Sequence, residues 1–173
     1  MKTVIIAEAG VNHNGSIDLA KQLVDVAKEA GADYVKFQTF KAKNLATRNA
    51  EKADYQKKNN TNESHFDMLK KLELNHKSHK EIISYCNKVK IKFLSTGFDI
   101  DSINMLIDLK IPLIKIPSGE ITNLPYLRHV GKMKKPIIMS TGMSTMDDVN
   151  EALKVLNDAG ANLDDVTDGI FIK

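Results

Sequence analysis

Short apolar runs alternate with helical patterns along the chain, and this order constrains the fold more than any other feature. The runs have the length and the Ile, Leu and Val content of strands that are buried on both faces. They cover residues 4–9, 34–39, 91–96, 113–118 and 136–141. Because helical segments lie between them, the sequence predicts an α/β fold with a parallel sheet and right-handed crossovers.

Helix ends are marked by residues that favour caps. Ser16 is a predicted N-cap and Gly31 a predicted C′ residue of the first helix. A later helix is expected to begin near Asn123, with Pro125 in its first turn. The last clear helix is expected to have Ser144 as its N-cap and Gly160 as its stop. Its predicted buried residues are Met146, Val149, Ala152, Leu153 and Leu156.

Composition excludes several classes of protein. The chain is 42% hydrophobic and 27% charged, which is typical of a globular protein rather than a disordered one. No apolar run approaches the ~20 residues that span a membrane, and Glu8 interrupts the first run too early for a signal peptide. The single cysteine, Cys86, excludes an internal disulfide and a Cys-rich metal site. These features together predict a cytoplasmic protein with no membrane segment.

The positive charge does not have the pattern of a nucleic-acid binder. Only Arg48 and Arg128 are arginines, and the lysines are spread along the chain among acidic residues. Nucleic-acid binders usually gather Arg and Lys with aromatic residues on one face. We therefore interpret these lysines as a solvated surface and expect no nucleic-acid partner.

Polar side chains stand at the ends of all five apolar runs. In parallel α/β folds, ligands bind beyond the carboxyl ends of the strands. A buried Glu8, Lys36 or Lys115 without partners would cost several kcal/mol. The pattern therefore predicts a binding site, and mutual ion pairing is the alternative. The side chains concerned are Glu8, Lys36, Gln38, Ser95, Thr96, Lys115, Ser118, Glu120, Ser140 and Thr141.

These residue types suit an anionic ligand. Lysine acts as a point charge on phosphate or carboxylate, and hydroxyls beside glycine turns can bind phosphate oxygens. Glu8 and Glu120 supply carboxylates that can transfer a proton or hold a polyol. The sequence contains neither a Walker A motif nor a dinucleotide-binding fingerprint, so it does not indicate a nucleotide.

Five ordered segments resemble the sialic acid synthase family, which includes N-acetylneuraminate synthases and legionaminate synthases. The middle of the chain, residues 53–74, looks like the bacterial members of both. The five segments are EAGVNHNGS (8–16), VKFQTFKA (35–42), FLSTGFD (93–99), KIPSGEITN (115–123) and STGMST (140–145).

The resemblance implies a TIM barrel followed by a small antifreeze-like domain, in a domain-swapped homodimer. It implies condensation of phosphoenolpyruvate with an N-acetylmannosamine-type aldehyde. The enol carbon attacks the aldehyde carbon, water adds at the former enol carbon, and phosphate leaves by C–O cleavage. A divalent metal, Mn²⁺ or Mg²⁺, is expected to polarise the aldehyde oxygen.

The resemblance also implies roles for particular residues. Glu8 and Glu120 match carboxylates near the reacting carbons and the sugar, with Glu8 expected to handle the proton. Asn59 matches a sugar-contacting asparagine. The residues that match the holders of phosphoenolpyruvate are Lys36, Thr96, Lys115, Ser118 and Ser140.

The five histidines are not needed for these roles. His13 lies in the first strand–helix loop. We interpret it as a hydrogen-bonded loop residue rather than as a functional residue. The other four, His65, His76, His79 and His129, are expected on helix surfaces.

The sequence departs from the family pattern in two places. The family usually has proline where Gly97 stands, and glycine is expected to loosen the turn that places Thr96. After Thr167 the resemblance fails, where a sixth strand beginning near Val166 should end in a metal-binding histidine. We therefore expect residues 1–173 to be the N-terminal part of a (β/α)8 barrel, truncated to five or six βα units. The metal ligands and the antifreeze-like domain would be missing.

Two other functions stay open at this point. The chain could be an inactive fragment that retains a phosphoenolpyruvate-binding half-site. It could also be a Schiff-base aldolase on the same fold, with Lys115 as its nucleophile, although such a lysine needs a desolvated site that lowers its pKa.

Overall fold

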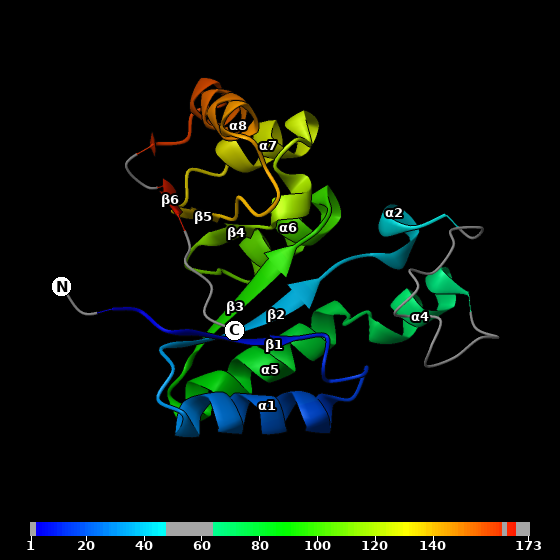
Figure 1. Cartoon of the computed structure of the whole chain (residues 1–173). Coiled ribbons are helices and arrows are strands. Elements are labelled where there is room, and N and C mark those ends of the chain that lie inside the picture. The colour runs from blue at the N-terminus through cyan, green and yellow to red at the C-terminus, as the bar shows by residue number, and fades with distance from the viewer. Residues whose placement is uncertain (1–2, 48–63, 164–165, 169–173) are drawn as a thin grey trace. The chain divides into compact units, whose positions relative to one another are not determined.

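The computed structural model describes residues 3–47, 64–163 and 166–168. The chain divides into two compact units, Met1–Phe93 and Leu94–Lys173. Each unit alternates strands with helices and pairs its strands in parallel, as the sequence predicts for the α/β class (Figure 1). No helix in the described ranges has the length and apolar content needed to cross a membrane.

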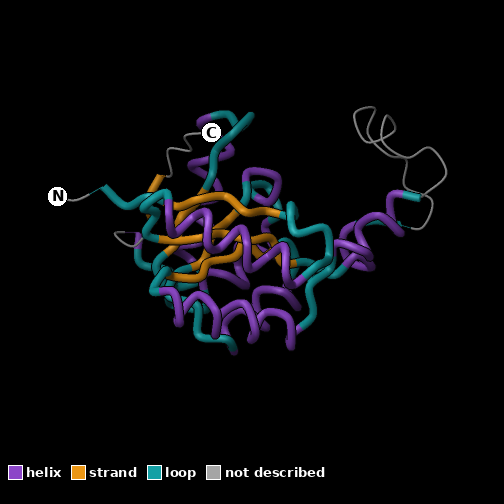
Figure 2. Tube along the Cα trace, turned by 90° about the horizontal axis from the view of Figure 1, so that it is seen from below, coloured by secondary structure: helices purple, strands orange, loops and turns teal. Residues whose placement is uncertain are grey.

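The first unit pairs two parallel strands and covers them with helices. β1 and β2 are in register with Ile6 opposite Tyr34 and Glu8 opposite Lys36. The helix α1 packs against both strands and against α5, which are labelled in Figure 1. Figure 2 shows the helices in purple and the strands in orange. The elements are β1 (Ile6–Gly10), α1 (Ile17–Glu29), β2 (Tyr34–Thr39), α2 (Ala42–Leu45), α4 (His65–Leu72) and α5 (His76–Val89).

The predicted start of the first helix is confirmed. Ser16 is the N-cap of α1, and its Oγ accepts a hydrogen bond from the Leu19 amide. Gly31 follows the helix with φ +78°, a conformation that favours glycine. The first strand was predicted to start at Val4, but β1 starts at Ile6, and Val4 is exposed. The prediction was wrong there because the register with β2 begins only at Ile6.

The second unit carries the remaining strands in a parallel arrangement. β3 begins at the end of the first unit and pairs with β4 through Thr96 and Lys115. β4 pairs with β5, and β5 pairs with β6, the expected sixth strand. The elements are β3 (Lys92–Gly97), α6 (Ile100–Asp108), β4 (Ile114–Ile116), the 3₁₀ turn η1 (Ser118–Glu120), α7 (Leu124–Gly131), β5 (Ile137–Met139), α8 (Met146–Asp158) and β6 (Val166–Asp168).

The ends of the helices in the second unit partly match the predictions. Asn123 is the N-cap of α7, as predicted, with Pro125 in the first turn. The N-cap of α8 is Thr145 rather than Ser144, because Thr145 and Asp148 form a capping box. Met146 is therefore the first helical residue, and it is 70% exposed rather than buried.

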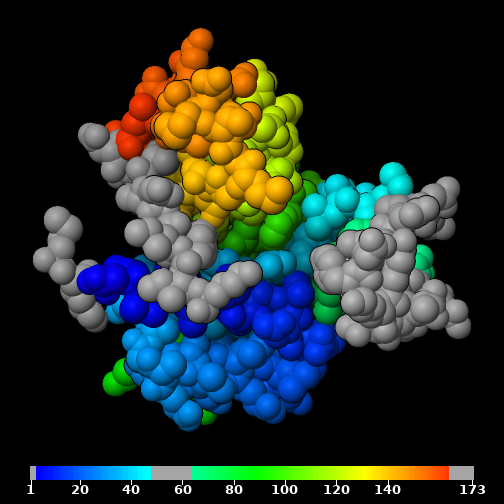
Figure 3. Space-filling view, viewed as in Figure 1, coloured from blue at the N-terminus to red at the C-terminus, as the bar shows by residue number. Residues whose placement is uncertain are grey.

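The inner face of α8 is otherwise close to the prediction. Ala152 and Leu156 are buried, whereas Val149 and Leu153 are only half-buried. The helix packs against α7 and forms part of the outer surface of its unit, seen in orange in Figure 3.

Candidate active site

Lys115 is a buried cation in the second unit. It lies on β4 and is 3% exposed. Its Nζ donates hydrogen bonds to the Ile116 carbonyl and to Ser140 Oγ, each at 2.7 Å. Both of these partners are neutral oxygens, and they orient the ammonium group.

Three hydroxyl residues lie on this strand end and on the neighbouring strand ends. Thr96 is buried and lies directly opposite Lys115 in the β3–β4 ladder. Ser118 opens the turn η1, two residues after β4 ends. A Cβ added to Gly142 would lie 3.5 Å from Ser118 Oγ, so the loop after β5 passes close to Ser118. Ser140, in the same loop, bonds to Lys115 as described above.

Glu120 stands on the turn that carries Ser118. It is half-buried, and Asn123 Nδ2 donates a 2.6 Å hydrogen bond to its Oε2. Asn123 also caps α7, so the same side chain orients the carboxylate and begins the helix. Five of the predicted site residues therefore stand on consecutive strand ends of the second unit, namely Thr96, Lys115, Ser118, Glu120 and Ser140.

The first unit holds the other predicted lysine and carboxylate as an ion pair. Lys36 on β2 is buried, and its Nζ contacts Glu8 Oε2 on β1. The Glu8 side chain keeps 46% of its surface exposed. Ion pairing, the alternative to ligand binding, thus describes this pair. A half-exposed carboxylate can nevertheless still meet a ligand.

The interpretation of His13 as a hydrogen-bonded loop residue is confirmed. Its side chain is fully buried, and its Nδ1 accepts a hydrogen bond from the Gly15 amide at 3.0 Å. The Nε2 atom has no hydrogen-bond partner in the part of the chain that the structure describes. Burial lowers the pKa of this histidine below its usual value.

The prediction that His79 lies on a helix surface was wrong. His79 is 0% exposed, because the face of α5 that carries it also carries the buried Ile82 and Cys86. Its Nε2 lies 2.7 Å from Thr39 Oγ1 and its Nδ1 lies 2.9 Å from the Asn75 carbonyl.

The tautomer of His79 follows from these contacts. A carbonyl only accepts hydrogen bonds, so Nδ1 carries the proton and Nε2 accepts from the Thr39 hydroxyl. Burial lowers the pKa of His79, which keeps the ring neutral.

Of the other histidines, His76 is exposed, His129 is half-buried and lies 2.7 Å from the Asn104 side chain, and His65 is half-buried with a buried, unpartnered Nδ1.

Asn59, the predicted sugar contact, lies outside the described residues. Within the described ranges, no group of three or more His, Cys, Asp or Glu side chains is placed so that it could hold a metal ion. The residues that the structure describes therefore do not fit the divalent metal that the resemblance implies.

Comparison with known proteins shows what this chain is similar to. The sequence profile of the NeuB family matches residues 23–166. The N,N'-diacetyllegionaminic acid synthase of Campylobacter jejuni is 53% identical over 167 residues, which are 96% of this chain and 50% of that protein. The enzyme of the same name from Legionella pneumophila is 53% identical over 154 residues, 88% of this chain and 43% of that protein. The chain thus spans about half the length of these curated relatives.

A solved structure of a related enzyme has a similar fold. The N-acetylneuraminic acid synthetase of Leptospira borgpetersenii, crystallised with citrate, superposes with a TM-score of 0.79 at 25% sequence identity. The match covers 92% of this chain and 52% of that protein.

Proposed function

Since the chain belongs to the NeuB family, we propose that it takes part in the condensation of phosphoenolpyruvate with N-acetylmannosamine or a related 2-acetamido sugar. The products are an N-acetylneuraminate-type nonulosonic acid and phosphate. The observation that carries the proposal is the buried Lys115 ammonium, which Ser140 orients and Thr96 adjoins on the next strand. A buried cation surrounded by hydroxyls suits a small, multiply charged anion.

Binding of phosphoenolpyruvate is the first step. We assign Lys115, Thr96, Ser118 and Ser140 to the ligand, and we assign Lys36 to the same molecule. Two ammonium groups would then offset the charges of its phosphate and carboxylate. Because Lys115 is held on two sides by neutral oxygens, it can meet the ligand with little reorganisation.

We assign proton transfer and sugar binding to the two carboxylates. When the methylene carbon of phosphoenolpyruvate bonds to the aldehyde carbon, the aldehyde oxygen takes up a proton and becomes a hydroxyl. The neighbouring carbon, which carries the phosphate, becomes electron-poor and takes up water. We assign Glu8 to accept the proton of that water, after which the C–O bond to phosphate breaks and phosphate leaves. Glu120, whose Oε2 accepts from Asn123, is assigned to hold a hydroxyl of the sugar.

The divalent metal of the family would polarise the aldehyde oxygen. No set of described residues suits it, so no step above is assigned to a metal.

The wider architecture extends the same proposal. We propose that the parallel strands of both units belong to a TIM-type barrel, of which residues 1–173 form the N-terminal part with five or six βα units. The superposition on the Leptospira synthetase supports this assignment. The antifreeze-like domain, the homodimer and the cytoplasmic location that the sequence predicts stay predictions.

Titration of the chain with phosphoenolpyruvate by calorimetry tests the proposal. We expect binding in the wild-type chain and its loss in Lys115→Ala. The matched control is Lys154→Ala, which removes an exposed lysine from α8 and should bind as the wild type does. Unchanged binding in Lys115→Ala would contradict the site.

Phosphate release separates turnover from binding alone. A half-site that binds phosphoenolpyruvate without turnover is a second candidate, because the chain spans about half of its relatives. The assay mixes the chain with phosphoenolpyruvate, Mn²⁺ and N-acetylmannosamine. We expect no release above background from this chain alone, because the described residues supply no metal site. Release above background would instead favour full condensation.

A Schiff-base aldolase is a lesser candidate. Its nucleophile must be free to attack a carbonyl as an amine, whereas Lys115 Nζ is held by hydrogen bonds to the Ile116 carbonyl and to Ser140 Oγ. Borohydride trapping with pyruvate should therefore give no covalent adduct at Lys115 by mass spectrometry. An adduct there would support the aldolase.

A further inference from the structure

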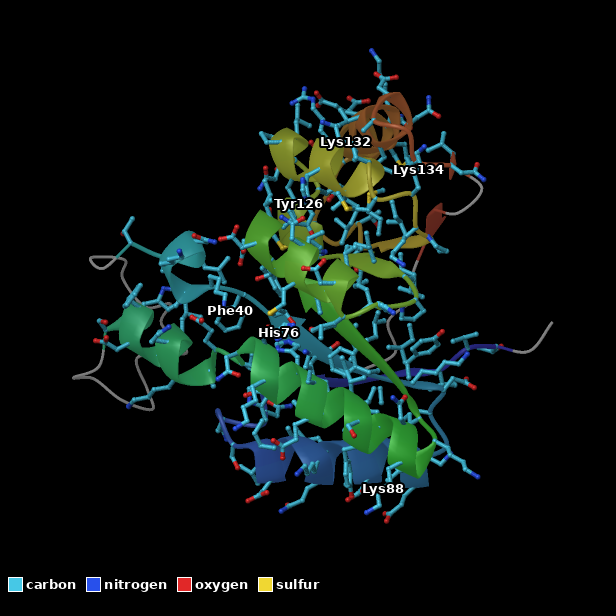
Figure 4. The ribbon with its side chains drawn as sticks, turned by 180° about the vertical axis from the view of Figure 1, so that it is seen from behind. Phe40, His76, Lys88, Tyr126, Lys132 and Lys134 are labelled. Atoms are coloured by element: carbon cyan, nitrogen blue, oxygen red, sulfur yellow. The ribbon has the colours of Figure 1, made fainter. Side chains whose placement is uncertain are left out.

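A buried tyrosine joins two turns of the candidate site. Tyr126 lies in the first turn of α7, is 1% exposed and is labelled in Figure 4. Its hydroxyl donates a 2.7 Å hydrogen bond to the carbonyl of Gly97, the last residue of β3. Gly97 directly follows Thr96, which we assign to phosphoenolpyruvate.

The carbonyl of Gly97 needs such a donor. Gly97 is buried, and a buried carbonyl must be paired because it has left water. Glycine also has more conformational freedom than any other residue, so a turn at this point is the least constrained by its own backbone. The Tyr126 hydroxyl fixes the orientation of the peptide that follows Gly97.

Tyr126 is also linked to Glu120, through its backbone amide. The Tyr126 amide donates to Asn123 Oδ1 at 3.3 Å, and Asn123 Nδ2 donates to Glu120 Oε2 at 2.6 Å. A short chain of hydrogen bonds therefore runs from the carboxylate, through Asn123 and Tyr126, to the turn beside Thr96. Glu120 and Asp99 are close enough to raise the pKa of Tyr126, after the larger effect of burial, so its hydroxyl stays a donor.

We propose that Tyr126 is a positioning residue of the active site, and that it sets the placement of Thr96 relative to Glu120. The inference rests on the proposed function, in which Thr96 meets phosphoenolpyruvate and Glu120 meets the sugar. Tyr126 touches neither substrate. Its hydroxyl acts on Gly97, while its backbone amide bonds to Asn123, so the side chain ties the turn beside Thr96 to the helix start that orients Glu120.

The substitution Tyr126→Phe tests the proposal, because it keeps the ring and removes only the hydroxyl. Hydrogen–deuterium exchange is measured on peptides that cover residues 95–98 and 118–123. We expect residues 95–98 to exchange at least fivefold faster than in the wild type, because they lose the hydroxyl donor. Residues 118–123 and α8 should be unchanged, because phenylalanine keeps the backbone amide that donates to Asn123. We also expect at least fivefold weaker binding of phosphoenolpyruvate, measured well below the unfolding temperature of both proteins.

A matched control separates positioning from general destabilisation. Tyr85→Phe removes another tyrosine hydroxyl, which donates to both carboxylate oxygens of Asp25 in the first unit. We expect this variant to bind phosphoenolpyruvate within twofold of the wild type. Equal losses in the Tyr85 and Tyr126 variants would overturn the proposal, since a merely structural role predicts no difference between them.

The proposed function and this inference can fail separately. If the wild-type chain does not bind phosphoenolpyruvate, the proposed function fails, and the exchange measurement alone decides whether the Tyr126 hydroxyl holds the turn beside Thr96. If exchange in residues 95–98 is unchanged by Tyr126→Phe, or if affinity is unchanged where the wild type binds, the role of Tyr126 is refuted.

Discussion

The buried pair of Thr39 and His79 offers a quantitative test of the first unit. Thr39→Val keeps the shape of the threonine side chain but removes the hydroxyl that donates to His79 Nε2. The ring nitrogen is then left buried without this donor. Such a loss costs about 1–3 kcal/mol of unfolding free energy. For a chain of this size, the unfolding temperature should fall by about 2–12 °C.

A double-mutant cycle isolates the interaction. His79→Leu removes both ring nitrogens, and the Asn75 carbonyl still accepts from the backbone amide of residue 79. Combining Thr39→Val with His79→Leu replaces both partners with apolar groups, which is often close to neutral. We expect the double variant to be more stable than the sum of the single losses predicts, with a coupling of about 1–2 kcal/mol. Urea unfolding followed by circular dichroism at pH 7.5 measures all four proteins.

The same histidine predicts how stability depends on pH. Burial lowers the pKa of His79 in the folded protein, and the nearby charges of Lys41 and His76 oppose protonation as well. The unfolded state, with a histidine pKa near 6.5, therefore binds the proton first as the pH falls. Stability is complete above about pH 6.5 and is lost on acidification towards the folded pKa.

The variant His79→Leu should flatten this acid dependence. One histidine contributes at most about 1.4 kcal/mol for each pH unit between its two pKa values. His13, whose pKa is also lowered by burial, leaves part of the dependence in place. The reasoning would be refuted by a Thr39→Val protein as stable as the wild type, or by a His79→Leu protein with the full wild-type dependence.

The structure predicts the direction of the effect for four further substitutions. Lys90→Gly should stabilise the chain by about 0.5–1 kcal/mol in thermal unfolding, because Lys90 has φ +60°, while Lys88→Gly inside the same helix should destabilise it by a similar amount. Gly131→Ala should destabilise by about 1–3 kcal/mol, since its Cβ would lie 2.8 Å from the Leu156 carbonyl oxygen. Ser140→Ala should weaken phosphoenolpyruvate binding about tenfold in calorimetry while the unfolding temperature moves little.

Local chemistry accounts for the parts of the fold that the sequence predicts well. The caps Ser16 and Asn123 are recognisable because an N-cap bonds only to amides two or three residues away. The start of α8 is harder, because Ser144 and Thr145 are both suitable caps. The deciding residue is Asp148, which lies three positions after Thr145 and completes a capping box with it.

Tertiary packing decides what the sequence pattern leaves open. His79 shares a helical stripe with Ile82 and Cys86, at spacings of three and four residues, and this spacing is the signal for its burial. A histidine at such a position needs partners for its ring nitrogens, and one of them is Thr39, forty residues earlier. The sequence shows the stripe but not the partner.

The candidate site is also predictable from the sequence only in part. Thr96, Lys115, Ser118 and Ser140 can be identified as candidates from the sequence, since each lies within or ends a predicted strand. The sequence does not show which hydroxyl bonds to which lysine, because that depends on the strand register and on the path of the loops. The bond from Lys115 to Ser140 and the pairing of Glu8 with Lys36 are therefore findings of the structure.

Gly97 shows how packing can compensate for a flexible residue at a site. From the sequence, glycine was expected to loosen the turn that places Thr96. In the structure its Cα lies against Ile103 and its carbonyl accepts from Tyr126, so contacts from α6 and α7 supply the restraint that its own backbone lacks. The order of this turn thus depends on residues up to 29 positions away. It follows that changes in α7 should alter Thr96 more than changes in the turn's own exposed side chains.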